Sequence, residues 1–238
     1  MRTGFVRRKF GELEVLSVMV MDSFPGVFHV FGMKQRSRSA GMREKEFFLI
    51  NLGLDPGSFA EVEQVHGSKV VVVSNPGVHG EADGLITVER GLVLGVKTAD
   101  CVPLLFYDRV TGVIAAIHAG WRGLARGIIE SAFKEMNVLF GVKARDVVVA
   151  VGPFIRSCCY RIGDEVGEFF MEDEIVRRNG SLFLDMEKSV LNRLIGAGVE
   201  DSNIGVIQLC TFCEDDMFHS YRREGEAAGR MYSLIVKR

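Results

Sequence analysis

The side chains best suited to chemistry in this sequence are a thiol and an imidazole, Cys101 and His118, placed at the ends of two apolar runs. Cys101 precedes the run 102–108, and His118 lies near the end of the run 112–119. An antiparallel hairpin of these runs places Cys101 opposite Ala119, and a slip of one residue places it opposite His118. Directly opposed side chains have Cβ atoms ~5 Å apart. The pattern therefore predicts that thiol and imidazole meet at one end of a hairpin.

Two kinds of site fit such a pair. A cysteine beside a histidine can act as a nucleophile, because the imidazole draws the proton from the thiol. Thiolate and imidazole are also zinc ligands, and a third protein ligand would leave the fourth position open, as in catalytic zinc sites. His66, in the polar segment EQVHGSKV, is a candidate third ligand, although a histidine in such a setting is more often a surface or hydrogen-bonded residue. Spacing alone leaves both chemistries open.

A candidate anion site lies in the segment 117–127, IHAGWRGLARG, where a strand ends, glycines turn the chain and a helix begins. Free N–H groups at a helix start attract anions, and Arg122 adds a positive charge. The alternative is that the glycines only turn the chain and that Trp121 packs. Asp83 and Asp100 lie beside the candidate ligands, and each is able to orient a histidine, hydrogen-bond a sugar hydroxyl or cap a turn.

The remaining cysteines carry a weaker signal. CTFC at 210–213 spells C-x-x-C, but a zinc ribbon needs a second C-x-x-C and the sequence has none. The vicinal pair Cys158 and Cys159 is interpreted as structural. Near the C-terminus, HSYRREG at 219–225 and Arg230 form a basic run, which is typical of a solvated face but is also able to close over an anion.

Composition places these residues in an ordinary globular chain. The 238 residues are 47% hydrophobic and 25% charged, which suits one large domain. A formal net charge of −2 argues against nucleic acid as a main partner. No apolar stretch reaches the ~18 residues that span a bilayer, and the N-terminus lacks the apolar core of a secretory signal. With an odd count of five cysteines, we expect reduced thiols, a cytoplasmic location and no membrane partner.

Apolar periodicity predicts the elements that must position the site. Strands without strict alternation with helices predict an α+β fold, a layered α/β sandwich with mixed sheets that forms a single domain over 1–238. The runs 102–108 and 112–119 are apolar nearly throughout, so both of their faces are expected to be covered. Strands are predicted at 13–21, 26–33, 69–74, 91–98, 102–108, 112–119, 146–153, 204–210 and 230–238, helices at 120–141, 164–180 and 187–199, and polar loops at 33–46 and 75–84.

Six motifs, in this order along the chain, carry a family resemblance: EQVHG, EADGLIT, KTADCVPLLFYD, AAIHAGWRG, GPFIRSCCYRIG and CTFCEDDMFHSYRREGEAAGR. Together they resemble the YfiH/laccase-domain family, also called polyphenol oxidase-like, from about residue 51 to the C-terminus. TADC followed by HAGWRG is a specific combination. The resemblance implies a single α+β domain of a kind also found in toxin-type Cys–His hydrolases.

The resemblance also implies an activity. It implies a zinc ion on His66, Cys101 and His118, with copper as the ion of the older laccase label. It implies phosphorolysis of the purine nucleosides adenosine, inosine and methylthioadenosine, with deamination of adenosine alongside. The candidate residues that follow are Cys101, His118 and Asp100 for catalysis, and Asp83, Arg122, Lys34 and Arg222 for binding nucleoside and phosphate.

Two departures from the family pattern bear on activity. Members usually carry F-S-T-R-x-G-G before NLG, whereas FGMKQRSRSAG has Lys34 where the arginine falls and lacks the paired glycines. We expect a substrate or phosphate contact from that arm to be altered or lost. Arg161 stands in CCYRIG where an acid is usual, which bears on substrate preference.

Three other functions fit some of these residues. A metal-free cysteine hydrolase would use Cys101 and His118, and its activity would survive chelation. A copper-dependent polyphenol oxidase needs several copper centres, which five histidines without an H-x-H pair support poorly. A non-enzymatic zinc-binding regulator would follow if a protein side chain closed the fourth ligand position.

Overall fold

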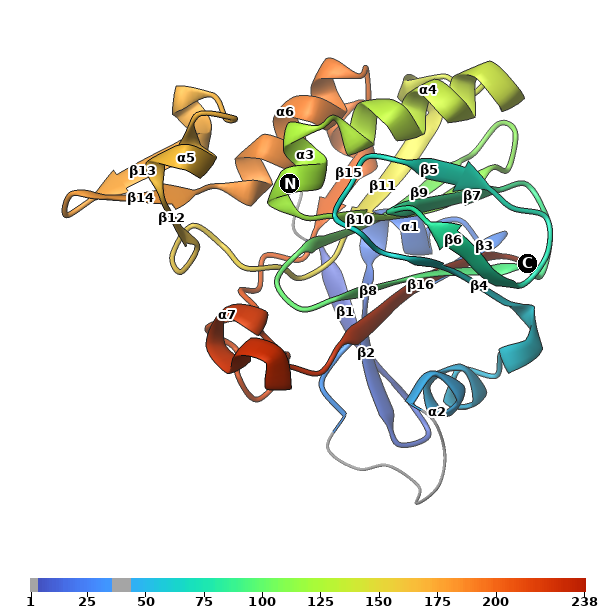
Figure 1. Cartoon of the computed structure of the whole chain (residues 1–238). Helices are drawn as coiled ribbons and strands as arrows, with labels where there is room; N and C mark the ends of the chain where they lie inside the picture. Colours follow the sequence, from blue (N-terminus) through green and yellow to red (C-terminus); the bar gives the residue numbers. More distant parts are fainter. Residues whose placement is uncertain (1–3, 36–43) are drawn as a thin grey trace.

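Two large β-sheets form the layers of the molecule (Figure 1). The structure, a computed structural model, describes residues 4–35 and 44–238. The first sheet has seven strands, in the spatial order β1 (Phe5–Phe10), β2 (Leu13–Val18), β3 (Val27–Gly32), β16 (Met231–Lys237), β8 (Val93–Thr98), β4 (Phe59–Glu63) and β6 (Gly77–Glu81). It is mixed, because β4 runs parallel to β6 and β8 whereas the other neighbours are antiparallel.

The second sheet carries the central apolar hairpin. Its six strands lie in the order β15 (Ile204–Val206), β11 (Val147–Val151), β9 (Val102–Asp108), β10 (Ile114–Ala119), β7 (Gly84–Thr87) and β5 (Val70–Val72). It too is mixed, with parallel pairs at both edges. A small antiparallel sheet stands apart from both, in the order β12 (Arg161–Ile162), β14 (Ser181–Leu184) and β13 (Ile175–Arg178).

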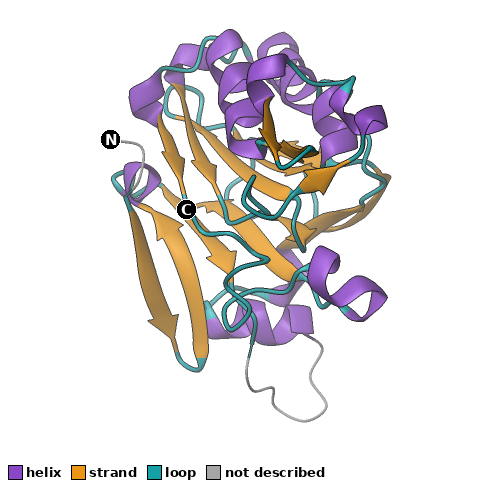
Figure 2. Cartoon of the chain, turned by 90° about the vertical axis from the view of Figure 1, so that its left-hand side faces the viewer, coloured by secondary structure: helices purple, strands orange, loops and turns teal. Residues whose placement is uncertain are grey.

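Helices cover the outer face of the second sheet, and Figure 2 shows most of them gathered above the strands. The described α-helices are α1 (Met19–Asp22), α2 (Glu44–Asn51), α3 (Trp121–Ala125), α4 (Ile128–Phe140), α5 (Asp164–Gly167), α6 (Met186–Gly196) and α7 (Tyr221–Glu224). Short 3-10 turns lie at Pro56–Ser58, Ala144–Asp146, Glu172–Glu174, Asp201–Asn203 and Gly225–Ala227. Within the described part of the chain, no helix combines the length and apolar composition needed to cross a membrane.

The strand β9 shows how one sheet serves two cores. Leu104 and Phe106 pack with the helices α4 and α6, whereas Leu105, which points the other way, packs in the core shared with the first sheet. All three side chains are fully buried. Successive strand residues point to opposite faces, so a strand covered on both faces must be apolar throughout. The predicted α+β layered sandwich is confirmed, and so is the covering of both faces of the central runs.

The hairpin of β9 and β10 forms, but its predicted register is wrong by one residue. Pro103 lies opposite His118 and Val102 opposite Ala119, so Cys101 stands just beyond the last pair. The loop is longer than expected, because the N–H of Asp108 donates to the carbonyl of Val113 and four residues lie between them. The Asp108 carboxylate holds this loop by accepting hydrogen bonds from the following N–H groups.

Several predicted elements differ from the structure. The helix predicted over 120–141 is two helices, because Gly127 takes a left-handed φ of 76° between α3 and α4. The helix predicted over 164–180 is wrong apart from α5, since β13 and β14 form a hairpin at Asn179 and Gly180, with φ of 49° and 71°. Positive φ at both central residues is the geometry that an Asn-Gly hairpin turn requires.

Smaller corrections concern ends and omissions. The strand predicted over 13–21 ends at Val18, where α1 begins, and the loop predicted over 75–84 contains β6. The strands β1, β4 and β7 and the small third sheet were not expected from the sequence. Of the polar loop predicted over 33–46, residues 36–43 lie outside the described residues, and Glu44 already begins α2.

Candidate metal and active site

Three side chains from separate segments converge at the end of the central hairpin. His66 lies in the loop between β4 and β5, Cys101 in the turn between β8 and β9, and His118 on β10. Their ligand atoms all lie within 4.8 Å of one another, and the two imidazole ring centroids are 4.8 Å apart at an interplanar angle of 82°. His118 is buried, Cys101 half-buried and His66 exposed. The structure thus brings together the three residues that the sequence singles out as ligands.

Asp83 fixes the orientation of His118. It directly precedes β7, the antiparallel neighbour of β10, and its backbone carbonyl accepts a hydrogen bond from the His118 N–H at 2.7 Å. The His118 Nδ1 lies 2.8 Å from the Asp83 Oδ1. A proton on Nδ1 that is donated to the carboxylate leaves Nε2 as the ring atom that faces the site. A carboxylate behind a histidine in this way is the usual support of a metal ligand.

The same carboxylate holds the loop that carries His66. Asp83 accepts hydrogen bonds from the backbone N–H of His66 at 2.9 Å and from that of Gly67 at 2.6 Å. His66 takes a φ of 58°, a conformation that residues other than glycine rarely adopt. Gly120 allows the close approach of the ligands, because a Cβ there would lie 3.1 Å from both Cys101 Sγ and His66 Cδ2. The three-ligand group is therefore built into the fold.

Charges within the group overcome the effect of burial on each residue. Burial raises the pKa of the Cys101 thiol, but the charge and hydrogen bond of His118 lower it to about 6. Burial lowers the pKa of His118, but Cys101 and Asp83 raise it to about 9. Burial also opposes ionisation of Asp83, yet hydrogen bonds from His118 and Gly67 hold the pKa of that carboxyl below its ordinary value. The pKa shifts of Cys101 and His118 both favour a thiolate beside an imidazolium in the metal-free site.

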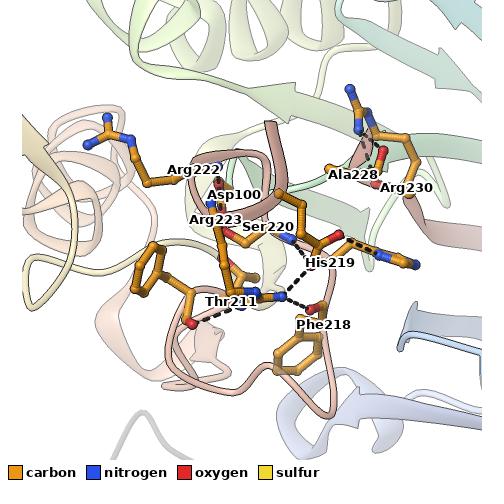
Figure 3. Close-up of polar contacts among 12 residues, drawn as sticks. Asp100, Thr211, Phe218, His219, Ser220, Arg222, Arg223, Ala228 and Arg230 are labelled. Carbon is orange, nitrogen blue, oxygen red and sulfur yellow. Dashed lines mark hydrogen bonds and ion pairs between the residues drawn. The ribbon is translucent and has the colours of Figure 1, made fainter. Parts of the chain in front are cut away.

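Asp100, next to Cys101, is tied to the C-terminal part of the chain (Figure 3). Its Oδ1 accepts a hydrogen bond from the Thr211 hydroxyl at 2.6 Å, and its Oδ2 accepts from the Ser220 hydroxyl at 3.0 Å and from the Arg222 N–H at 2.7 Å. Asp100 takes a φ of 90° and is 8% exposed. These bonds engage both carboxylate oxygens, so Asp100 fixes a loop against the Cys101 turn.

A cavity of about 870 Å³ opens over the three ligands. Its described lining includes the aromatic rings of Trp121, Tyr160 and Tyr221. Three arginines join them, and each guanidinium lies over one of these rings, at 4.5 Å for Arg122 over Trp121, 5.1 Å for Arg222 over Tyr160 and 5.8 Å for Arg230 over Tyr221. Among the described residues, no carboxylate forms an ion pair with any of the three arginines. The cavity therefore combines flat apolar faces with positive charge.

Not every predicted residue reaches the cavity. The sequence predicts a substrate contact for Asp83, but this side chain is fully buried behind His118 and is absent from the described lining, so its place is that of a positioning residue. Lys34 is also absent from that lining, and its backbone N–H donates to the Met217 carbonyl at 2.7 Å. Arg161 is exposed, and its carbonyl accepts a hydrogen bond from the Arg222 guanidinium at 2.8 Å.

Some lining residues were missed by reasoning from the sequence. Tyr160 and Tyr221 stand in motifs that carry the family resemblance, and this position was the available signal. Lys97, the first residue of KTADCVPLLFYD, had the same signal, whereas Glu61, which lies 3.2 Å from it at the cavity wall, had none. Arg223, by contrast, does not line the cavity. Its guanidinium donates hydrogen bonds to the backbone carbonyls of Thr211, Phe212 and Phe218 (Figure 3).

The fold defines an α+β protein with two large mixed sheets, and a His-Cys-His group lies beneath a cavity lined by aromatic rings and arginines. Known proteins share the fold. The family model described as multi-copper polyphenol oxidoreductase laccase matches residues 32–238. The chain belongs to this family, which confirms the resemblance to YfiH/laccase-domain proteins.

Named relatives and a solved structure agree with this membership. A purine nucleoside phosphorylase of Clostridium acetobutylicum is 38% identical over 165 residues, which are 66% of this chain and 68% of that protein. The adenosine deaminase RL5 of an unknown prokaryotic organism is 33% identical over 208 residues, 79% of each chain. The crystal structure of YlmD from Geobacillus stearothermophilus matches with a TM-score of 0.86 at 26% identity, covering 99% of this chain and 100% of that chain.

Proposed function

We propose that this protein is a zinc-dependent purine nucleoside phosphorylase that acts on adenosine, inosine and methylthioadenosine and also deaminates adenosine. The observation that carries the proposal is the position of the His-Cys-His group at the floor of a cavity lined by aromatic rings and arginines. The similarity to proteins named purine nucleoside phosphorylase and adenosine deaminase supports the choice of substrate.

The donor set suits zinc. One thiolate and two imidazoles are ligands that zinc accepts, and three protein ligands leave a fourth position for a water or a substrate. Asp83 supplies the carboxylate that orients His118. When bound, zinc supplies Lewis-acid chemistry, which withdraws charge from a ligand and acidifies water. Copper oxidation of phenols is less well supported, because among the described residues only two of the five histidines belong to a group with metal-ligand geometry.

The cavity suits a nucleoside together with phosphate. Its volume of about 870 Å³ falls within the ~300–1,000 Å³ typical of small-molecule sites. The rings of Trp121, Tyr160 and Tyr221 offer faces on which a purine can stack. The guanidinium groups of Arg122 and Arg222 present the planar donor sets that bind phosphate oxygens well.

In phosphorolysis, a phosphate oxygen bonds to the anomeric carbon while the glycosidic bond breaks and the base leaves with the bonding electrons. Arg122 and Arg222 are proposed to bind and orient the phosphate and to offset its charge. Cys101 and His118 are proposed to act as ligands, and Asp100 as the residue that holds the loop of Arg222 against the site.

A second candidate function has one observation in its favour. The low pKa of Cys101, about 6, and the high pKa of His118, about 9, describe the thiolate–imidazolium pair that a metal-free cysteine hydrolase would use. Such an enzyme keeps its activity in the presence of a chelator and loses it when Cys101 is alkylated.

The test is base release from inosine, with and without phosphate, by zinc-loaded protein and by variants. We expect phosphate-dependent release that yields ribose 1-phosphate, and we expect His66→Ala and Cys101→Ser to lose both this zinc and the activity. His79→Ala changes a histidine outside the site and should keep both. Zinc-loaded protein that leaves inosine and adenosine intact with phosphate present would refute the proposal. Activity that survives chelation and needs no phosphate would support the cysteine hydrolase instead.

A further inference from the structure

A second group of metal-binding side chains lies away from the cavity. The Sγ atoms of Cys158, Cys159, Cys210 and Cys213 all lie within 4.8 Å of one another. The vicinal pair follows β11, and the C-x-x-C pair follows β15 more than fifty positions later. The two further cysteines that a second C-x-x-C would provide are thus provided by the vicinal pair. The described lining of the cavity includes none of these four residues.

The distances between the sulfurs suit one metal ion. Tetrahedral coordination with zinc–sulfur bonds of ~2.3 Å separates the sulfurs by roughly 3.8 Å. Cys213 Sγ lies 3.7 Å from Cys158 Sγ and 3.3 Å from Cys159 Sγ. A polynuclear iron–sulfur cluster spreads its cysteines over several iron atoms, so a group in which every pair of sulfurs is this close fits a single ion better.

The backbone around Cys210 is arranged as the support of a thiolate ligand. The N–H of Arg156 donates to the Cys210 Sγ at 3.5 Å, and the N–H groups of Phe212 and Cys213 face the same sulfur. N–H groups that point at a ligand sulfur stabilise its negative charge. The two loops are also joined through backbone, because Phe154 and Cys210 form an isolated parallel bridge.

We infer that Cys158, Cys159, Cys210 and Cys213 hold a zinc ion in a closed site with four thiolate ligands. Four protein ligands leave no position for a substrate, so the site is structural. Buried Cys210 anchors it, whereas Cys158 and Cys213 are exposed. All five cysteines lie within the described ranges and are free thiols, so the four are available for a metal.

Two of the four cysteines directly precede residues that line or support the cavity. Cys210 directly precedes Thr211, whose hydroxyl donates to Asp100, and Cys159 directly precedes Tyr160, which lines the cavity. An ion on the four thiolates ties together the loop that carries Tyr160 and the loop that begins the C-terminal segment. Its loss should therefore loosen the cavity wall without removing the His-Cys-His ligands.

The test counts zinc in protein purified under reducing conditions with zinc present. The variant His66→Ala/Cys101→Ser lacks the first site, and we expect it to retain one equivalent of zinc per chain. Adding Cys210→Ser and Cys213→Ser to it should remove that equivalent. Adding Ser157→Ala, a change beside Cys158 but outside the ligand set, should not. Cobalt substitution of the first-site variant should give the intense sulfur-to-metal charge transfer of several thiolates. Neither measurement needs catalytic activity, so the result is independent of the proposed function.

Because Cys210 is buried, its replacement can unfold the loop, and the exposed Cys158→Ser supplies a second variant. We expect it to fold and to lose its zinc to a chelator faster than the parent protein. A folded first-site variant without zinc would overturn the inference. So would iron in place of zinc, or a disulfide between Cys213 and the vicinal pair that forms in the presence of zinc.

Discussion

The substitution Asp83→Asn tests whether one buried carboxylate organises the His-Cys-His site. Asp83 accepts hydrogen bonds from the His118 Nδ1 at 2.8 Å and from the N–H groups of His66 and Gly67 at 2.9 and 2.6 Å. All three partners are donors, and the Asp83 side chain is fully buried. Asparagine has one carbonyl oxygen and a donor NH₂ group in place of the second oxygen. At least one of the three donors must then face another donor.

The size of the effect follows from these contacts. A buried donor left without an acceptor costs about 1–3 kcal/mol. Loss of the carboxylate behind a ligating histidine weakens metal affinity by roughly 10–100-fold, or about 1.4–2.7 kcal/mol. We therefore expect Asp83→Asn to fold with a lower free energy of unfolding and to bind zinc in the His-Cys-His site roughly 10–100-fold more weakly. Urea unfolding of the metal-free protein and competition with a chromophoric chelator measure the two quantities.

Asp108→Asn is the matched control. Asp108 is also fully buried, and its carboxylate accepts hydrogen bonds from the N–H groups of Val110 at 3.4 Å and Thr111 at 2.9 Å, at the opposite end of the same hairpin. It should lose comparable stability and keep its zinc affinity. If Asp83→Asn binds zinc as tightly as the parent protein, or if both variants weaken binding equally, the assignment of Asp83 as the organising residue is wrong.

Three further predictions concern pH and phosphate. Burial lowers the pKa of His29 to about 4, so as pH falls the unfolded chain binds a proton at this imidazole before the folded protein does. Neutral His29 therefore contributes to stability above pH 6.5, and roughly 3 kcal/mol of the free energy of unfolding is lost as pH falls toward 4. Urea unfolding of the parent protein and of His29→Gln at both pH values would measure this loss. Between the pKa of Cys101 at about 6 and that of His118 at about 9, zinc binding must displace one proton, so the logarithm of affinity should rise by about one per pH unit, as chelator competition across this range would show. Arg122→Ala should raise the KM for phosphate about tenfold through the loss of charge-assisted hydrogen bonds, whereas steady-state kinetics of Arg126→Ala, an exposed neighbour outside the cavity lining, should match the parent protein.

How far the sequence predicts this molecule depends on whether a feature is local. The strands 102–108 and 112–119 follow from apolar composition, but their register does not, because it depends on a loop held open by the Asp108 carboxylate. The pattern at 164–180 has helical spacing, yet Asn179 and Gly180 form a hairpin turn there. That Asn-Gly pair is a local signal, and it outweighed the helical periodicity.

Features that depend on distant pairing are harder to predict. His66 and His118 meet because β7 pairs with both β5 and β10, which brings the loop of His66 and Asp83 to the end of the hairpin. The resemblance to a family supplied His66, whereas spacing favoured a surface histidine. The four-cysteine group shows the same limit, because its members become neighbours through the pairing of β11 with β15 and the bridge between Phe154 and Cys210.

Two buried aspartates on either side of Cys101 explain why ligand and substrate residues belong to one unit. Asp83 accepts hydrogen bonds from the His118 ring and the His66 backbone, and Asp100 accepts one from the backbone of Arg222. The Arg222 N–H donates to Asp100, one residue from the thiol, so a movement of the C-terminal loop moves a proposed phosphate ligand relative to the metal ligands. Asp100 takes a strained φ of 90° where its carboxylate accepts these hydrogen bonds at the edge of the cavity. An acid beside a cysteine at the mouth of a buried strand is therefore explained by two tasks: the thiol is presented to the site, and the carboxylate fixes the wall that closes it.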